Sequence, residues 1–302
     1  MLYLLLLLMV LAWSGNFVVA KLTLREMPPL TLLFLRIWMA CAILAVLYLV
    51  SQSRRRMRAS DWKNFVLLGV LGVAANQAGF ITGIQRTTVG HSSLIVSLCP
   101  VFVLILATRM KLEPLTWRKA VGMGLCFCGA AVLASEHGSG TSRPTLGGDL
   151  LTLGGTSAFA LYTVYSKRVS DRYDTLTLNT FVYATGALAV TPLAGWQVFT
   201  SPWETVTWRG WLGVVYMALI GSVIAYLIFY YGLTRLPASR VIVLTYLQPV
   251  VATTLGILVL GEETTPHLIA GGALILTGVY LAERQRAAFF SPPSHGESAG
   301  EH

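Results

Sequence analysis

The residues of this sequence that could do chemistry are polar side chains placed inside long apolar stretches. Side-chain amides occur there at Asn16, Asn76, Gln77 and Gln248. Away from water each amide needs a hydrogen-bond partner, which can be a neighbouring helix or a bound solute. Both interpretations stay open, and the second makes these residues candidates for lining a solute-binding site.

Aromatic side chains within the same stretches form a second group of candidates. They are Trp13, Tyr162, Tyr226, Tyr230 and Tyr246. A tyrosine in an apolar setting can stack against a solute and also hydrogen-bond it. Tyr226 and Tyr230 are four positions apart, so they share one face of a helix. Trp13, Tyr226 and Tyr246 lie deepest in their stretches and are the better candidates.

Arg36 is the one charge clearly inside an apolar stretch. A guanidinium at that depth must face protein or water, so Arg36 either binds a carboxylate of a solute or holds neighbouring backbone carbonyls. No acidic residue lies well inside such a stretch, and Asp149 is at an edge. A buried carboxylate is the usual means of carrying a proton or holding a cation. We therefore expect a neutral or zwitterionic solute, and no proton transfer through a carboxylate in the core.

Motifs for covalent or metal chemistry are missing from the sequence. There is no His-Glu-x-x-His and no nucleophile elbow, and the adjacent His91 and Ser92 share one helix, which is poor geometry for a triad. Cys126 and Cys128 lack the two-residue spacer of a zinc or redox pair. His91 begins an apolar stretch and is expected at the membrane interface, and a role in proton relay is the alternative. We expect no catalytic residue, metal or cofactor, and no enzyme.

The apolar stretches dominate the composition of the chain. Its 302 residues are 55% hydrophobic and 12% charged, with a mean hydropathy of +0.67, whereas soluble domains are about 25% charged. A helix needs about 20 apolar residues to cross a membrane. The sequence therefore predicts an all-α integral membrane protein. Its ten predicted transmembrane helices cover residues 2–20, 29–50, 62–84, 88–108, 118–135, 147–165, 176–196, 210–232, 238–260 and 266–283.

The basic residues give the predicted orientation. The net charge of +9 comes mainly from Lys and Arg in the connections after even-numbered spans, such as the four arginines within 54–58. Lys and Arg gather on the cytoplasmic side of membrane proteins. We expect a multi-pass protein of the cell (inner) membrane with both termini in the cytoplasm. The charge therefore gives no reason to expect nucleic acid as a partner.

The residue pattern of 62–133 recurs 149 positions later, over 211–282. The matched residues include Trp62 and Trp211, Gly72 and Gly221, Pro100 and Pro249, Glu113 and Glu262, and Gly122 and Gly271. Each copy would carry five helices, so the second enters the membrane from the opposite side, as an inverted-topology repeat. The predicted units are 1–136 and 137–285, followed by a disordered cytoplasmic tail at 286–302.

Pro100 and Pro249 are the matched pair with the clearest mechanical meaning. A proline inside a helix frees the carbonyl four residues earlier and bends the helix. We expect both prolines to act as hinges near the middle of the membrane. Two halves of opposite orientation offer two alternating open states, with a substrate site between them, as in many secondary transporters. A duplicated membrane scaffold without transport is the alternative.

Several loose motifs also occur in a fixed order along the chain. They are Trp13-Ser14-Gly15-Asn16-Phe17 with Lys21, Phe34-Leu35-Arg36, Leu98-x-Pro100, Glu113-x-x-Thr116 and Gly261-Glu262-x-x-Thr265. Together they resemble the EamA-type transporters of the drug/metabolite transporter superfamily.

This resemblance implies ten helices in two inverted halves, and export of amino acids or related small metabolites by alternating access. The expected partners are then a small-molecule substrate and the lipid bilayer. Export of drugs or aromatic cations, an uncoupled channel and a membrane-embedded enzyme are the alternatives. The substrate itself, the driving ion, the direction of net flux and the oligomeric state are not specified by the sequence.

Overall fold

The computed structural model describes residues 2–51, 58–110, 115–136, 144–170, 172–235 and 246–283. Every regular element in these ranges is a helix, which confirms the all-α prediction. The predicted tail at 286–302 and the first part of the predicted span 238–260 lie outside the described residues.

The helices follow the predicted spans closely, with several spans divided into consecutive elements. Their bounds are α1 (Leu2–Thr23), α2 (Pro29–Val50), η1 (Ala59–Asp61), α3 (Trp62–Gly69), η2 (Val70–Ala75), α4 (Asn76–Arg86), α5 (Val89–Val96), α6 (Cys99–Arg109), α7 (Trp117–Ala134), α8 (Leu146–Ser170), α9 (Thr175–Thr200), η3 (Trp203–Thr205), α10 (Trp208–Val215), η4 (Tyr216–Ile224), α11 (Ala225–Arg235), α13 (Leu247–Leu260) and α14 (Pro266–Glu283).

Seven helical segments among the described residues are long and apolar enough to cross a membrane. They are Leu2–Thr23, Pro29–Val50, Trp62–Arg86, Val89–Leu106, Trp117–Ala134, Thr175–Thr200 and Trp208–Phe229. Two shorter apolar helices, Leu247–Leu260 and Pro266–Ala282, accompany them. Large apolar side chains such as Leu49, Phe199 and Leu258 are exposed, as expected for helices that face lipid. The chain is therefore a multi-pass membrane protein.

Two continuous helical segments, called rods below, contain a stretch of π-helix that the sequence did not predict. In the rod Trp62–Arg86 it covers Val70–Ala75, and in the rod Trp208–Arg235 it covers Tyr216–Ile224. Moved by 149 positions, the first stretch falls on the C-terminal part of the second. The repeat seen in the sequence therefore extends to a rare backbone geometry, and π-helical turns often occur at functional sites.

The region of Pro100 is a break between helices rather than a bend within one. α5 ends at Val96 and α6 starts at Cys99, so Pro100 lies in the first turn of α6, where its missing N–H leaves no hydrogen bond unmade. Pro249 lies likewise in the first turn of α13. The residues before these two helices have similar backbone angles, with ψ of −10° at Ser97 and −14° at Tyr246. The hinge role of both prolines stays a prediction.

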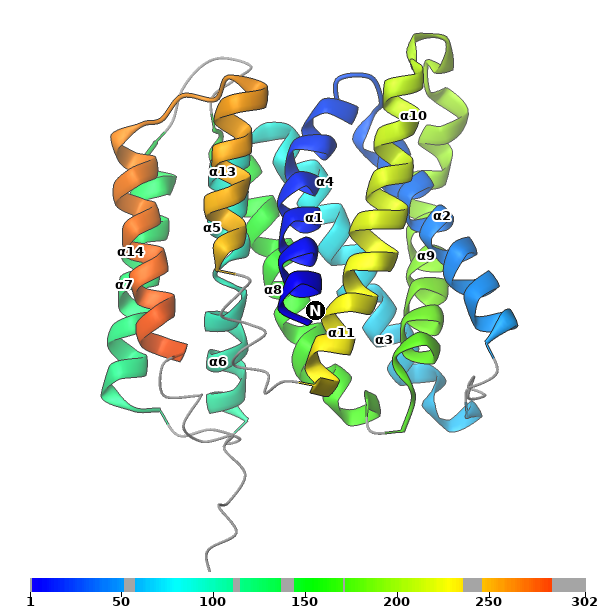
Figure 1. Cartoon of the computed structure of the whole chain (residues 1–302), viewed down its shortest axis with the longest axis horizontal. Helices are drawn as coiled ribbons and strands as arrows, with labels where there is room; N and C mark the ends of the chain where they lie inside the picture. The colour runs from blue at the N-terminus through cyan, green and yellow to red at the C-terminus, as the bar shows by residue number, and fades with distance from the viewer. Residues whose placement is uncertain are drawn as a thin grey trace, which may run out of the picture.

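The helices of the two sequence copies pack in reciprocal pairs (Figure 1). α1 packs against α13 and the η4–α11 rod, whereas α8 packs against α5, α6 and the η2–α4 rod. α2 packs against α9, and α7 packs against α14 at one edge of the bundle. These contacts between halves therefore come in pairs in which the two copies exchange places.

Four glycines bring α7 and α14 into direct backbone contact. A Cβ atom built on Gly122 would lie 2.6 Å from the carbonyl oxygen of Gly278, and one built on Gly129 would lie 2.7 Å from that of Gly271. Residue numbers rise along one helix as they fall along the other, so the two helices are antiparallel. Close approach of this kind is a main source of helix association in membranes.

This contact leads to a first prediction, with a matched control on the same helix. Gly122→Val should destabilise the protein by about 1–3 kcal/mol, because the new side chain would push α14 away. Gly124→Val should leave stability nearly unchanged, since no atom lies within 4 Å of a Cβ built there. Thermal unfolding of both variants in one detergent would measure the difference. Equal melting temperatures would show that the α7–α14 contact is not as tight as described.

Candidate functional site

Arg36 is buried in the middle of the bundle, with 3% of its surface exposed. Its Nε donates to the hydroxyl oxygen of Ser222 over 3.2 Å, which joins α2 to η4. Its Nη1 makes no hydrogen bond to any residue that the structure describes. Among the described residues no carboxylate forms an ion pair with it, so the guanidinium keeps both a charge and a donor for another partner.

Asn16 on α1 lies beside the same part of η4, and 6% of its surface is exposed. Within the described ranges its Oδ1 accepts no hydrogen bond. A Cβ built on Gly221 would be 2.6 Å from this oxygen and 3.8 Å from Nη2 of Arg36. Because Gly221 has no side chain, an acceptor and a donor that lack protein partners are brought together in one small region.

Aromatic rings form the wall of this region. Nε1 of Trp13 donates to the carbonyl oxygen of Gly221 over 3.1 Å. The ring of Trp13 meets that of Tyr226 edge to face, with centroids 5.4 Å apart, and Tyr226 lies 6.4 Å from Tyr183 in the same manner. Tyr183 lies close to Ser222, and both Tyr183 and Tyr226 lie close to Arg36. We call Trp13, Asn16, Arg36, Tyr183, Ser222 and Tyr226 the central cluster.

The π-helical geometry of η4 explains how Ser222 is positioned. Its hydroxyl donates to the carbonyl oxygen of Met217, five residues earlier, over 3.0 Å. Five residues is the spacing of a π turn, so the wider turn brings this carbonyl within reach. The hydroxyl oxygen then remains available to accept from Arg36.

Four residues that the sequence singled out meet in the central cluster. They are Trp13, Asn16, Arg36 and Tyr226. Sequence reasoning did not identify Tyr183 or Ser222, which are buried at 3% and 2% exposure. The signal that could have found Ser222 is its position directly after Gly221 in the repeated pattern. Tyr183 carries no comparable signal, because its role depends on how α9 packs against α11.

Other candidates lie around Gly72, the sequence counterpart of Gly221. The buried ring of Tyr162 packs against Gly72, so that a Cβ there would be 2.5 Å from a ring carbon. Tyr162 is 149 positions after Trp13, so this contact is the counterpart of the one between Trp13 and Gly221. Nδ2 of Asn76 donates to the carbonyl oxygen of Gly72 within its own rod over 3.3 Å, and Gln77 is buried beside it.

The remaining candidates lie outside the central cluster. Tyr246 packs against the apolar cluster between α5, α7 and α14. The backbone carbonyl of Gln248 accepts a hydrogen bond from Ser14 over 3.2 Å, which ties α13 to α1. Tyr230 belongs to α11, but its side chain lies outside the described part of the chain.

Apolar membrane-spanning helices around a buried polar cluster are typical of a membrane protein that binds a solute. The chain matches the EamA-like transporter family over residues 1–135 and 146–283. It therefore belongs to that family and is a membrane transporter, as its motifs had indicated.

Its relatives carry similar descriptions. An uncharacterised transporter of Archaeoglobus fulgidus is 29% identical over 288 residues, covering 92% of this chain and 96% of the relative. A probable terminal-alkyne amino-acid exporter of Streptantibioticus cattleyicolor is 29% identical over 231 residues, covering 76% of each chain. A crystal structure with 23% identity and a TM-score of 0.64 covers 95% of this chain and 98% of its own, so it shares the fold.

Proposed function

We propose that this protein is a secondary transporter of the cell (inner) membrane that exports amino acids or related small zwitterionic or neutral metabolites. Transport would proceed by alternating access between two halves of opposite orientation, 1–136 and 137–285, with both termini in the cytoplasm. The name of the Streptantibioticus relative, a probable exporter of an amino acid, favours this class of substrate.

The packing pairs favour the opposite orientation of the halves. A two-fold relation makes each contact between halves reciprocal, as with α1 and α13 against α8 and α5–α6. α7 and α14 occupy equivalent places in the two copies and run antiparallel. Two equivalent helices that cross one membrane in opposite directions belong to inverted repeats, in which substrate sites lie near the middle of the membrane.

The observation that carries the proposal is the pair of buried atoms without protein partners, Nη1 of Arg36 and Oδ1 of Asn16. A buried polar group without a partner is costly, so it is expected to meet a ligand or water. A carboxylate can accept from the guanidinium, and an ammonium or hydroxyl group can donate to the amide oxygen. These are the two polar ends of an amino acid.

Export of aromatic cations is the main alternative, and the aromatic wall of Trp13, Tyr183 and Tyr226 is the feature that favours it. Arg36 argues against this alternative, because its positive charge would repel a cation. The described residues of the central cluster include no carboxylate that could compensate for this repulsion.

Flux into liposomes that contain the purified protein would test the proposal. We expect saturable uptake of an amino acid from a panel of amino acids, sugars and aromatic cations. Asn16→Ala and Tyr226→Ala should lower this uptake by about tenfold, the effect of one lost hydrogen bond or aromatic contact. Asn179→Ala is the matched control, since this buried amide donates within its own helix α9, to the carbonyl oxygen of Thr175. Unchanged flux in both cluster variants would contradict the proposed site.

A further inference from the structure

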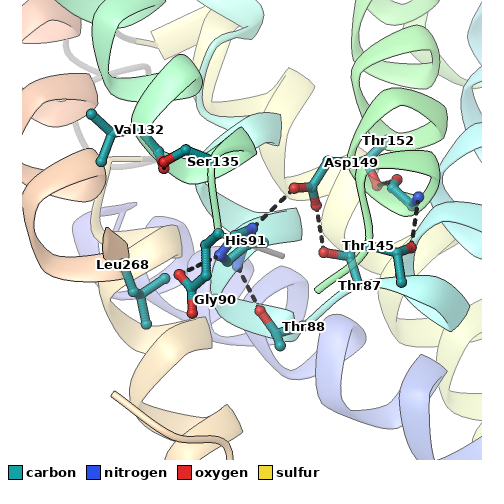
Figure 2. Close-up of polar contacts among 12 residues, drawn as sticks. Thr87, Thr88, Gly90, His91, Val132, Ser135, Thr145, Asp149, Thr152 and Leu268 are labelled. Carbon is teal, nitrogen blue, oxygen red and sulfur yellow. Dashed lines mark hydrogen bonds and ion pairs between the residues drawn. The ribbon is translucent and has the colours of Figure 1, made fainter. Parts of the chain in front are cut away.

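A second polar cluster lies at the end of the bundle where α1 finishes, and His91 is at its centre (Figure 2). The sequence predicted an interfacial side chain, but His91 is only 1% exposed. Its Nδ1 lies 3.0 Å from Oδ2 of Asp149 on α8. Its Nε2 lies 3.2 Å from Oε2 of Glu136, just after α7. Both ring nitrogens therefore face a carboxylate.

The two neighbouring carboxylates determine which protonation state of His91 fits this geometry. A neutral imidazole carries one N–H, and an ionised carboxylate can only accept hydrogen bonds. With neutral His91, one ring nitrogen would direct its lone pair at a carboxylate oxygen about 3 Å away. Such a contact is unfavourable in a buried setting. With both carboxylates ionised, the two hydrogen bonds can form together only when the ring carries both protons.

Hydrogen bonds from threonines support this assignment. The hydroxyl of Thr87 donates to Oδ1 of Asp149, and the hydroxyl of Thr265 donates to Oε2 of Glu136 over 2.8 Å. Each of the two carboxyl groups therefore already accepts a hydrogen bond from a hydroxyl group. The backbone N–H of His91 donates to the hydroxyl oxygen of Thr88, which caps the start of α5.

The other charged groups at this end either have partners of their own or are exposed. Lys21 of α1 donates to the backbone carbonyl of Thr87 and lies 3.8 Å from Glu262. Arg86, Glu263 and His267, on the elements around α5, are exposed. Glu26 accepts from the backbone N–H and hydroxyl of Thr207, and these hydrogen bonds hold its pKa below the usual value. Near neutral pH, Glu26 therefore remains ionised.

The cluster also joins the two halves of the chain. His91 belongs to the first copy and Asp149 to the second. Glu136 ends the first copy and binds Thr265 of the second. Loss of a proton from His91 would leave two carboxylates beside a neutral ring, and would weaken these connections between the halves.

We infer that His91, Asp149 and Glu136 form a proton-binding site that holds one proton on His91 in this conformation and releases it when this end of the bundle opens. A proton bound in one conformation and lost in the other is coupled to the change between them. The bound proton is independent of the proposed function, whereas its coupling to solute flux rests on that function. The site lies at the end of the bundle, away from the central cluster.

Nuclear magnetic resonance of protein with 15N-labelled histidine rings would test the bound proton directly. The chain has five histidines, and His91→Gln assigns the signal of His91 by its loss. We expect both ring nitrogens of His91 to be protonated at pH 7, where an unperturbed histidine is mostly neutral. Glu136→Gln should return the ring to the neutral form, and Glu263→Gln should not. A neutral His91 in the unmodified protein would overturn the inference.

Flux measurements would test the coupling. With a pH difference across the liposome membrane, the flux of the unmodified protein should change several-fold, and that of Glu136→Gln should change little. Without a pH difference, both proteins should transport. A protonated His91 together with flux that ignores the pH difference would overturn the coupling. A protonated His91 without transport of any solute would leave the proton site in place and refute the proposed function.

Discussion

Arg36→Met should lower the flux of an amino acid through the reconstituted protein by about 10- to 100-fold. A hydrogen bond to a charged group contributes about 1.5–3 kcal/mol, and each 1.4 kcal/mol is a factor of ten. The loss of flux should come from the missing hydrogen bond between Arg36 and the carboxylate of the solute. The unmodified protein should therefore prefer an amino acid to its amide, and the variant should transport both at a similar low rate.

Stability measurements separate this role from a structural one. A buried charge with one protein hydrogen bond contributes little to folding, and an apolar replacement of similar size is often neutral or stabilising. Arg36→Met should therefore unfold at the same temperature or higher. Arg209→Met is the control, because this arginine is exposed at the start of α10 and should alter neither property. A clear loss of stability in Arg36→Met, with unchanged preference for the amino acid, would assign Arg36 to structure.

The sequence predicted the helices more completely than the site. Hydropathy and the repeat of glycines and prolines can both be read directly from the sequence, so they identified the helices and matched pairs such as Gly122 and Gly271. Trp13, Asn16, Arg36 and Tyr226 stood out because polar or aromatic groups are unusual inside apolar stretches. Tyr183 and Ser222 did not, because their positions depend on tertiary packing and on a π turn for which no sequence rule is available.

His91 shows a second reason why part of the structure escaped prediction. Its position at the start of an apolar stretch is typical of an interfacial residue. Asp149 and Glu136 are 58 and 45 positions away in the sequence, and both lie near helix ends. Only the packing of α5 against α8 and the end of α7 encloses the three side chains together.

Glu262→Ala is expected to have the second large effect, on stability. The carboxylate of Glu262 accepts from the backbone N–H groups of Val89 over 2.7 Å and Gly90 over 3.2 Å, at the start of α5. It also lies 3.8 Å from Nζ of Lys21. The ion pair is only partly buried, but two N–H donors at the positive end of a helix would lose a charged acceptor, and a hydrogen bond to a charged group contributes about 1.5–3 kcal/mol. The melting temperature should therefore fall by several degrees.

The neighbouring Glu263 provides the matched control for this change. It has the same side chain and is exposed, so Glu263→Ala should unfold within about 0.5 kcal/mol of the unmodified protein. Glu262→Gln should be intermediate, because an amide oxygen can still accept from one N–H group. If Glu262→Ala and Glu263→Ala melted together, the contact between the α13–α14 turn and α5 would contribute no stability.

The π-helical stretches at matching places in the two halves have a mechanical consequence. A π turn takes up about one residue more than an α turn, and one residue corresponds to about 100° of rotation around a helix. Tightening η4 into an α-helix would therefore swing Tyr226 on α11 away from Trp13 without melting a single turn. The same change in η2 would rotate α4 relative to α3, so each of the two segments can turn one of its parts against the other.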